Sequence, residues 1–290
     1  MGSSSIEIPL FKRTDRIKTK TYISIYEQDT NSNEILLEFA KMDFICLQAI
    51  HQEEARKLSM WWKNIGLSKR LPFSRDRLIE CYFLVLSIYF ETCHSRARVM
   101  MTKCITHISM LDDIYDVYGT LEELHLLTNG IQSVTLITTG YSFLTCASYI
   151  GIEEVIPKDV FDWVTSFPEI IKATSTIGRL MNNVASYELE QKRNHVASVV
   201  QCYVMEHECS EEEACKKLLK MSNDAWKIIN KEFVTQNKLP LSLIWPIINV
   251  ALFNEFIYLG KDLYTNSDHI IKETISDVLI EPIQIHKLKD

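Results

Sequence analysis

The sequence contains little glycine and little proline, with 8 and 7 residues in a chain of 290. Sheets connected by many tight turns depend on these residues, so their scarcity disfavours a β-rich fold. No apolar run reaches the roughly 20 residues that a membrane-spanning helix needs. Excess positive charge is also missing, since the formal net charge is -7. These absences argue against a nucleic-acid partner and against a membrane span.

Two further signals are absent. The eight cysteines include no CxxC pair, so we expect reduced thiols rather than a disulfide framework or a zinc site. Residues 1–20 lack the apolar core of a secretory signal, and we interpret them as an N-terminal extension. We therefore expect a cytoplasmic protein with one all-α domain over residues 21–290.

Helical periodicity is what the sequence does contain, because apolar residues recur three and four positions apart in almost every long segment. Ser210 and Glu213 form a capping box, and Gly119 suits a helix end. Residues 120–150 are ambiguous, since the β-branched run VTLITT allows a two-stranded excursion, although a broken helix is favoured. We expect helices over residues 33–64, 72–92, 95–118, 130–150, 168–193, 210–235, 240–260 and 267–280.

Two acids continue an apolar stripe on the third of these helices. Met101, Ile105 and Ile108 are spaced by four and three, and further steps of four reach Asp112 and Asp116. Carboxylates on an inward face, near a helix C-terminus, are costly without a cation. Mg²⁺ prefers such oxygen ligands. The alternative is a solvated acidic helix end, and this spacing alone does not decide between the two.

A polar ladder lies further along the chain. Asn182, Ser186 and Glu190 share one helical face over about 12 Å, from the rise of 1.5 Å per residue. Their amide, hydroxyl and carboxylate oxygens can bind a hard cation. Arg179, three residues earlier, falls on the same face and can bind a phosphate oxygen. An ordinary polar helix surface is the alternative, and by itself it would be preferred.

A basic pair, Arg75 and Arg77, precedes the first acidic motif in LPFSRDRLIE. Guanidinium groups near a helix N-terminus favour an anion such as phosphate. Two surface arginines separated by Asp76 are the simpler interpretation of this segment taken alone.

Together these three segments resemble the C-terminal catalytic domain of plant class I terpene synthases. DDIYD at Asp112–Asp116 is similar to the family's DDxxD motif, and NNVASYELE at Asn182–Glu190 to its second metal-binding motif. RDR at Arg75–Arg77 is similar to the arginine pair that captures the released diphosphate. Flanking segments such as SRARVMMTKCITHISMLDDIYDVYGTLEEL agree. The resemblance extends over nearly the whole chain beyond about residue 20, and it implies the helical bundle of isoprenoid synthases, here incomplete.

The resemblance also implies roles for individual residues. Mg²⁺ ions, three in number and replaceable by Mn²⁺, would be bound on two walls of one pocket, with the substrate's diphosphate. Asp262 and Tyr264 match a loop that caps the pocket and would take part in catalysis. The implied metal ligands are Asp112, Asp116, Asn182, Ser186 and Glu190, with Asp113 in support. Arg75, Arg77 and Arg179 would hold the diphosphate as catalytic residues, and Asp112, Asp116 and Asn182 would contact the substrate with them.

The sequence departs from the family pattern in three places. Asn183 replaces a frequent aspartate, and Leu84 stands where many relatives have a pocket tryptophan. Asp112 and Asn182 are 70 positions apart, about half the separation in relatives. We interpret this as an internal deletion of pocket helices joined near Thr128–Asn129. The family's N-terminal helical domain is also expected to be absent.

The leading hypothesis is a Mg²⁺-dependent terpene synthase that ionises farnesyl diphosphate and cyclises it to a sesquiterpene. A monoterpene synthase using geranyl diphosphate is the alternative in substrate. A second alternative is a catalytically impaired remnant of a shortened transcript that binds metal or associates with itself or its relatives through exposed helices. A prenyl chain-elongating enzyme is rejected, because such enzymes carry two aspartate-rich motifs.

Overall fold

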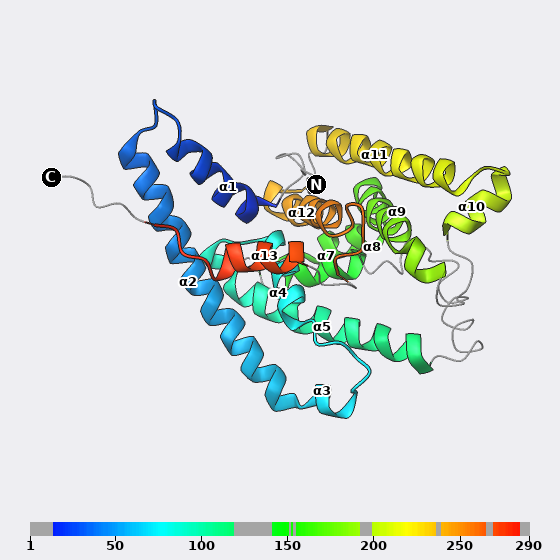
Figure 1. Cartoon of the computed structure of the whole chain (residues 1–290), viewed down its shortest axis with the longest axis horizontal. Coiled ribbons are helices and arrows are strands. Elements are labelled where there is room, and N and C mark those ends of the chain that lie inside the picture. The colour runs from blue at the N-terminus through cyan, green and yellow to red at the C-terminus, as the bar shows by residue number, and fades with distance from the viewer. Residues whose placement is uncertain are drawn as a thin grey trace, which may run out of the picture. The chain divides into compact units, whose positions relative to one another are not determined.

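Helices form the regular structure of the chain. The computed structural model describes residues 14–118, 141–150, 152, 155–191, 199–235, 239–264 and 269–284, and no strand occurs among them (Figure 1). The all-α fold expected from the sequence is therefore confirmed. The chain divides into two compact units, which we call the N-terminal unit and the central unit.

The N-terminal unit combines the first helices with the last one. It contains α1 (Asp15–Glu27), α2 (Glu34–Ile65), α3 (Leu67–Arg70), α4 (Leu78–Ile88), the 3-10 turn η2 (Thr92–His94), α5 (Ser95–Tyr118) and α13 (His269–Leu279). Helices α1 and α13 both pack against α2, and α4 packs against both α2 and α5, which also contact each other. Residues almost 260 positions apart are thereby joined, since Lys20 Nζ donates to the Asp277 backbone oxygen.

Both ends of helix α2 are set by capping residues in its sequence. The Asn33 side chain accepts a hydrogen bond from Leu36 N at 3.0 Å and caps the N-terminus. At the other end, Gly66 adopts a left-handed conformation with φ of 67°, and its N–H donates to Trp62 O. Glycine is favoured there because it has no Cβ to clash in this conformation.

A buried charged network connects three helices of the N-terminal unit. Arg98 on α5 donates through Nε and Nη2 to the two carboxylate oxygens of Glu54 on α2, at 2.8 and 2.7 Å. Tyr82 on α4 donates to the same carboxylate at 2.8 Å. Arg98 is fully buried, and its Nη1 donates to Glu91 O at 2.6 Å. The satisfied donors make burial of this charge tolerable.

The central unit is built round one long helix. It contains α7 (Tyr141–Tyr149), α8 (Lys158–Thr165), α9 (Glu169–Gln191), α10 (Val199–His207), α11 (Glu211–Thr235) and α12 (Leu241–Ile257). Helix α9 packs against α7, α10, α11 and α12. Its buried side includes Ile170, Ile177 and Met181, which share a core with Ile244 and Ile247 of α12. This packing fixes the rotation of α9 about its axis and thus the side of the helix on which each polar residue lies.

Most of the expected helices are present, with corrections at their starts. Pro72 does not open a helix, because α4 begins at Leu78 and residues 72–77 form a connecting segment. Ser95 is the first residue of α5 rather than its cap, since η2 directly precedes it. The capping box is confirmed: Ser210 N donates to Glu213 Oε2, and Glu213 N donates to Ser210 Oγ.

The periodicity of the sequence did not predict four helices, α1, α3, α8 and α10. They are only 13, 4, 8 and 9 residues long. The buried pair Val160 and Val164, spaced by four, was the available signal for α8. In the ambiguous segment, residues 141–149 are helical and residues 119–140 lie outside the described part. The expected boundary at residue 20 falls inside α1, and the division into 1–20 and 21–290 stays a prediction.

Two expectations from composition can be compared with the structure. All eight cysteines belong to the described residues, and each is a free thiol. Among the helices that the structure describes, none combines the length and the hydropathy needed to cross a bilayer.

The Arg98–Glu54 pair leads to a stability prediction. Glu54→Ala leaves the Arg98 charge buried without its partner, and we expect the free energy of unfolding to fall by about 3–5 kcal/mol. Urea denaturation followed by circular dichroism measures this. Glu53→Ala on the same helix is the matched control, because the Glu53–Arg56 pair is exposed and its loss should change little. Equal effects of the two substitutions would contradict the prediction.

His51 on α2 makes stability depend on pH. Its burial, together with the nearby Arg98 charge, lowers the pKa of the imidazole to about 4. An unfolded chain binds this proton near pH 6.5, so stability is complete above pH 6.5 and is lost as the pH falls towards 4. We expect this residue alone to contribute up to about 3 kcal/mol of that loss. His51→Gln should remove it, and parallel pH dependences of the variant and the unaltered chain would refute this role.

Candidate functional site

The arginine segment between α3 and α4 is tied to the helix that carries the DDIYD motif. Arg77 is buried as the N-terminal boundary residue of α4, and its Nη1 donates to Ser109 Oγ of α5 at 3.4 Å. Its Nη2 lies 3.7 Å from Asp113 Oδ1. The Arg75 side chain is exposed, whereas its backbone N–H donates to Asp113 Oδ2 at 3.1 Å.

Asp113 is the centre of this connection. Its Oδ2 also accepts a hydrogen bond from Ser74 Oγ at 2.7 Å, so both carboxylate oxygens are engaged by residues 74–77. The side chain is only 8% exposed. Sequence reasoning assigned Asp113 to the metal and did not identify Ser74. The only sequence signal for Ser74 was its position directly before the RDR segment. This signal is weak, because serine is common in connecting segments.

Asp112 and Asp116 both belong to α5, in its last two turns. Their side chains lie outside the described part of the chain. The inward stripe that leads to them is only partly confirmed, since Met101 and Ile105 are buried but Ile108 is 42% exposed. The buried side of α5 instead continues through Met110 to Asp113. Seven residues turn a helix through about 700°, so Ile108 shares the face of Met101 to within about 20°. Its exposure is therefore decided by what packs on that part of α5 and not by its spacing.

Helix α9 carries the whole polar ladder. Asn182 is half-buried and Ser186 is buried, one turn apart, while the Glu190 side chain is outside the described part. Arg179 is exposed on the preceding turn. Asn183 folds back on the helix and donates from Nδ2 to Arg179 O at 2.7 Å. The amide nitrogen of Asn183 is therefore used within α9.

Asp262 and Tyr264 lie in the segment that follows α12. The Asp262 carboxylate is almost fully buried, and its Oδ1 accepts a hydrogen bond from Tyr264 N at 3.0 Å. Leu263 N donates to Ile257 O at 3.0 Å, which returns the chain to the end of α12. Asp262 thus shapes the turn that presents Tyr264. Their expected role in capping a pocket stays a prediction.

Leu84 on α4 differs from its neighbours in exposure. Residues 81–83 and 85–89 are all buried, and Leu84 alone in this run is partly exposed. Leu84 is therefore outside the fully buried part of α4. An aliphatic side chain there has no ring face to attract a cation.

The donor types fit a hard divalent cation. The expected ligands offer carboxylate, amide and hydroxyl oxygens, which suit Mg²⁺, and no sulfur or imidazole. They come from α5 in the N-terminal unit and α9 in the central unit. Where side chains are described, no three His, Cys, Asp or Glu residues form a cluster for a metal. The fit therefore depends on the oxygen donors of the two motifs.

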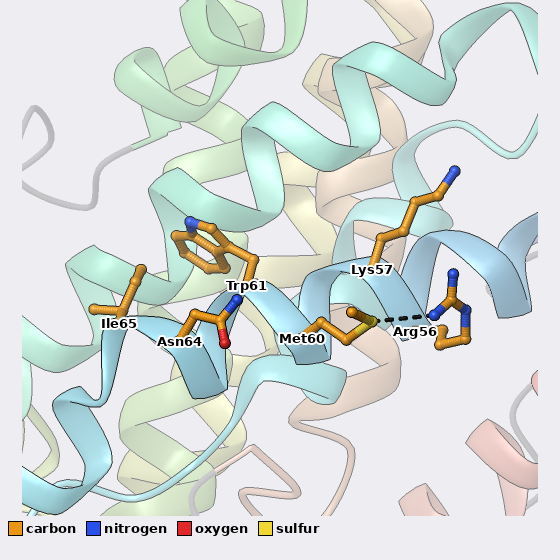
Figure 2. A pocket seen from close by; sticks show the side chains of 6 residues that line it. All are labelled: Arg56, Lys57, Met60, Trp61, Asn64 and Ile65. Carbon is orange, nitrogen blue, oxygen red and sulfur yellow. Dashed lines mark hydrogen bonds between the residues drawn. The ribbon is translucent and has the colours of Figure 1, made fainter.

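A separate groove of about 460 Å³ lies along α2 (Figure 2). The positive charge of Arg56 in this groove is paired with Glu53, to which Arg56 donates through Nε and Nη2. Its Nη1 contacts Met60 Sδ at 3.0 Å. Lys103 Nζ of α5 lies 4.9 Å from the Trp61 ring. None of the expected site residues lines it, so we do not identify it with the predicted site. The lining residues are Arg56, Lys57, Met60, Trp61, Asn64 and Ile65.

Comparison with known proteins places these motifs in a family. The sequence profile described as "Terpene synthase family, metal binding domain" matches residues 63–136 and 133–228, more than half of the chain. Beta-eudesmol synthase of Zingiber zerumbet is 37% identical over 349 residues, which include 95% of this chain and 63% of that protein. The (+)-germacrene D synthase of Zingiber officinale is 35% identical, over 97% of this chain and 64% of the relative. The chain thus spans less than two thirds of the length of these relatives.

Solved structures agree on the fold. Isoprene synthase from Populus x canescens, in complex with three Mg²⁺ ions and dimethylallyl-S-thiolodiphosphate, superposes with a TM-score of 0.84 at 25% identity, covering 97% of this chain and 68% of that one. Limonene synthase with 2-fluorolinalyl diphosphate gives a TM-score of 0.82 at 25% identity, covering 97% and 65%. With its two motif helices in place and its profile match over both, the chain belongs to the terpene synthase family and carries its metal-binding domain.

Proposed function

We propose that this chain is a Mg²⁺-dependent terpene synthase that ionises farnesyl diphosphate and cyclises it to a sesquiterpene in the cytoplasm. The observation that carries the proposal is the α9 ladder, which presents Asn182 and Ser186 one turn apart within a matched metal-binding domain. The relatives named as sesquiterpene synthases support farnesyl diphosphate as the substrate. Geranyl diphosphate is the alternative, because pocket volume decides chain length.

The metal would be held by oxygen ligands from both motif helices. Asp112 and Asp116 on α5, with Asn182, Ser186 and Glu190 on α9, are the residues that would hold three Mg²⁺ ions, or Mn²⁺ in their place. Bound Mg²⁺ supplies charge stabilisation for the leaving diphosphate. The isoprene synthase complex with three Mg²⁺ ions supports the number.

The arginines would bind the diphosphate directly. Arg75 and Arg179 are exposed and can reach an anion, whereas Arg77 is buried against α5. Because the Asp113 carboxylate holds Ser74 Oγ and Arg75 N, we assign it to positioning the arginine segment rather than to binding metal. Guanidinium groups placed in advance stabilise the negative charge that develops as the C–O bond breaks. Asp262 and Tyr264 would then close the pocket over the allylic cation.

The second candidate is a catalytically impaired remnant, which would follow from the internal deletion that we infer. The alignment with beta-eudesmol synthase extends over 349 residues, more than the 290 of the chain, so the relative has residues without counterparts here. The profile also matches in two stretches that meet at residues 133–136, close to the join we place near Thr128–Asn129. A less enclosed pocket admits water, which intercepts the cation, and we expect linear or hydroxylated products. Exposed helices would then favour self-association.

Product analysis separates the two candidates. The purified chain is incubated with farnesyl or geranyl diphosphate, with Mg²⁺ or with a chelator, and extracts are analysed by gas chromatography–mass spectrometry. We expect a Mg²⁺-dependent terpenoid, and Asp112→Ala should reduce its yield at least about 100-fold, since lost metal binding removes several kcal/mol of charge stabilisation. Asn183→Ala is the matched control and should stay within about twofold. A folded chain that makes no product would establish the remnant.

The role of Asp113 can be tested without catalysis. Asp113→Asn should weaken binding of inorganic diphosphate about tenfold in titration calorimetry, because the arginine segment loses its charged anchor. Mg²⁺ affinity of the variant should stay unchanged. Ser74→Ala removes a second contact to the same carboxylate and should shift diphosphate affinity in the same direction. A metal ligand would behave differently: Mg²⁺ affinity would fall in Asp113→Asn, as in Asp112→Asn, and Ser74→Ala would have no effect.

A further inference from the structure

A tyrosine hydroxyl occupies the space that a side chain at Gly178 would need. A Cβ built at Gly178 on α9 would overlap the Tyr141 hydroxyl, and it would lie 2.5 Å from Tyr141 Cζ and 3.0 Å from Asn254 Nδ2. Real Cβ atoms do not approach other atoms this closely, so only glycine fits here without displacing the tyrosine ring. Three helices of the central unit, α7, α9 and α12, contribute one residue each.

The Tyr141 phenol is a hydrogen-bond donor at every physiological pH. Desolvation raises its pKa to about 12, although the Asn254 amide and the Arg179 charge counteract the rise. Asn254 is 6% exposed, and its Nδ2 has no hydrogen-bond partner within the described part of the chain. The amide therefore lies beside the hydroxyl and lowers its pKa as a hydrogen-bonding group, while no hydrogen bond of good geometry engages Nδ2 among the described residues.

Other buried polar groups occupy neighbouring positions along α7 and α9. Ser175 Oγ and Thr174 Oγ1 on α9 and Ser142 Oγ on α7 are buried, and the described residues offer them no hydrogen bond. Each unsatisfied buried group costs about 1–3 kcal/mol, so such groups normally bind water or a ligand. The surrounding core of the central unit is aliphatic, which makes this polar patch stand out.

The patch has a defined place relative to the expected ligands. Gly178 precedes Asn182 by four residues and Ser186 by eight, so the three lie on one side of α9. Along the helix axis, Gly178 is about 6 Å from Asn182, towards the N-terminus of α9, whereas Ser186 lies towards the C-terminus. With the diphosphate bound at Asn182 and Ser186, a hydrocarbon chain that follows α9 towards its N-terminus reaches Tyr141.

We propose that Tyr141 and Asn254 hold a water molecule beside Gly178 and that this water sets the ratio of alcohol to hydrocarbon products. The inference rests on the proposed function. The water oxygen would donate a lone pair to the allylic cation and form a C–O bond, and the resulting oxonium would lose one proton to the released diphosphate. Tyr141 and Asn254 orient the water and accept no proton, since a neutral phenol and an amide are weak bases. This bound water is distinct from the bulk water that would enter a less enclosed pocket, because two side chains fix its position.

The first test measures stability and needs no catalysis. If water satisfies the Asn254 donors, Asn254→Leu removes a hydrogen-bonded group and should raise the unfolding equilibrium constant about tenfold in urea titration. Tyr141→Phe should reduce that effect, because both side chains bind the same water. An unsatisfied amide predicts the opposite sign, since an apolar replacement would then stabilise the fold. A stabilising Asn254→Leu would overturn the water site.

The second test measures products in the presence of Mg²⁺ and farnesyl diphosphate. Tyr141→Phe and Asn254→Leu should each lower the alcohol fraction of the products about fivefold. Tyr149→Phe is the matched control, because Tyr149 is a buried tyrosine of the same helix that donates to Leu243 O. An unchanged alcohol fraction would show that bulk water is the nucleophile and would overturn the proposal. Absence of any product from the unaltered chain would instead refute the proposed function, and this role with it.

Discussion

The buried pair of Arg98 and Glu54 joins α2 to α5, and the Tyr82 hydroxyl adds α4 to the same carboxylate. Removing one charge from such a pair leaves the other buried without compensation, which is far costlier than losing an exposed ion pair. The three connected helices carry the N-terminal half of the candidate site. Helix α5 contains the DDIYD motif, and the arginine segment leads directly into α4. Their mutual placement therefore depends on an interaction that touches neither substrate nor metal.

A second, smaller contact refines that placement. Asp113 extends the connection from the helix core to residues 74–77 through two hydrogen bonds and an ion pair. Asp113 is therefore held within the fold by the arginine segment. Adjacent residues of a helix point about 100° apart, so Asp112 and Asp113 cannot serve the same ligand equally. In the proposed function, Asp113 positions the arginine segment, and Asp112 and Asp116 would hold the cation.

Much of the fold could be predicted from single residues. Ser210 with Glu213 and the periodicity of α5 and α9 are local signals, because capping and amphipathic spacing involve residues within one or two turns. The short helices α8 and α10 gave too few periodic residues. Ile108 shows the limit of pattern reasoning, since its spacing indicated burial and its environment leaves it exposed. Ser74 and Tyr141 could not be identified, because their partners Asp113 and Gly178 are more than 35 positions away.

The sequence by itself determined the helical class, the oxygen donors on α5 and α9, and the family to which the chain belongs. These depend on residue type and on spacing along one helix, which a linear pattern contains. Only the tertiary structure decided that Asp113 binds the arginine segment, that Asn183 folds back on α9, and that a tyrosine hydroxyl fills the space beside Gly178. Such contacts depend on how helices rotate and pack, and many side chains distant in sequence jointly fix that rotation.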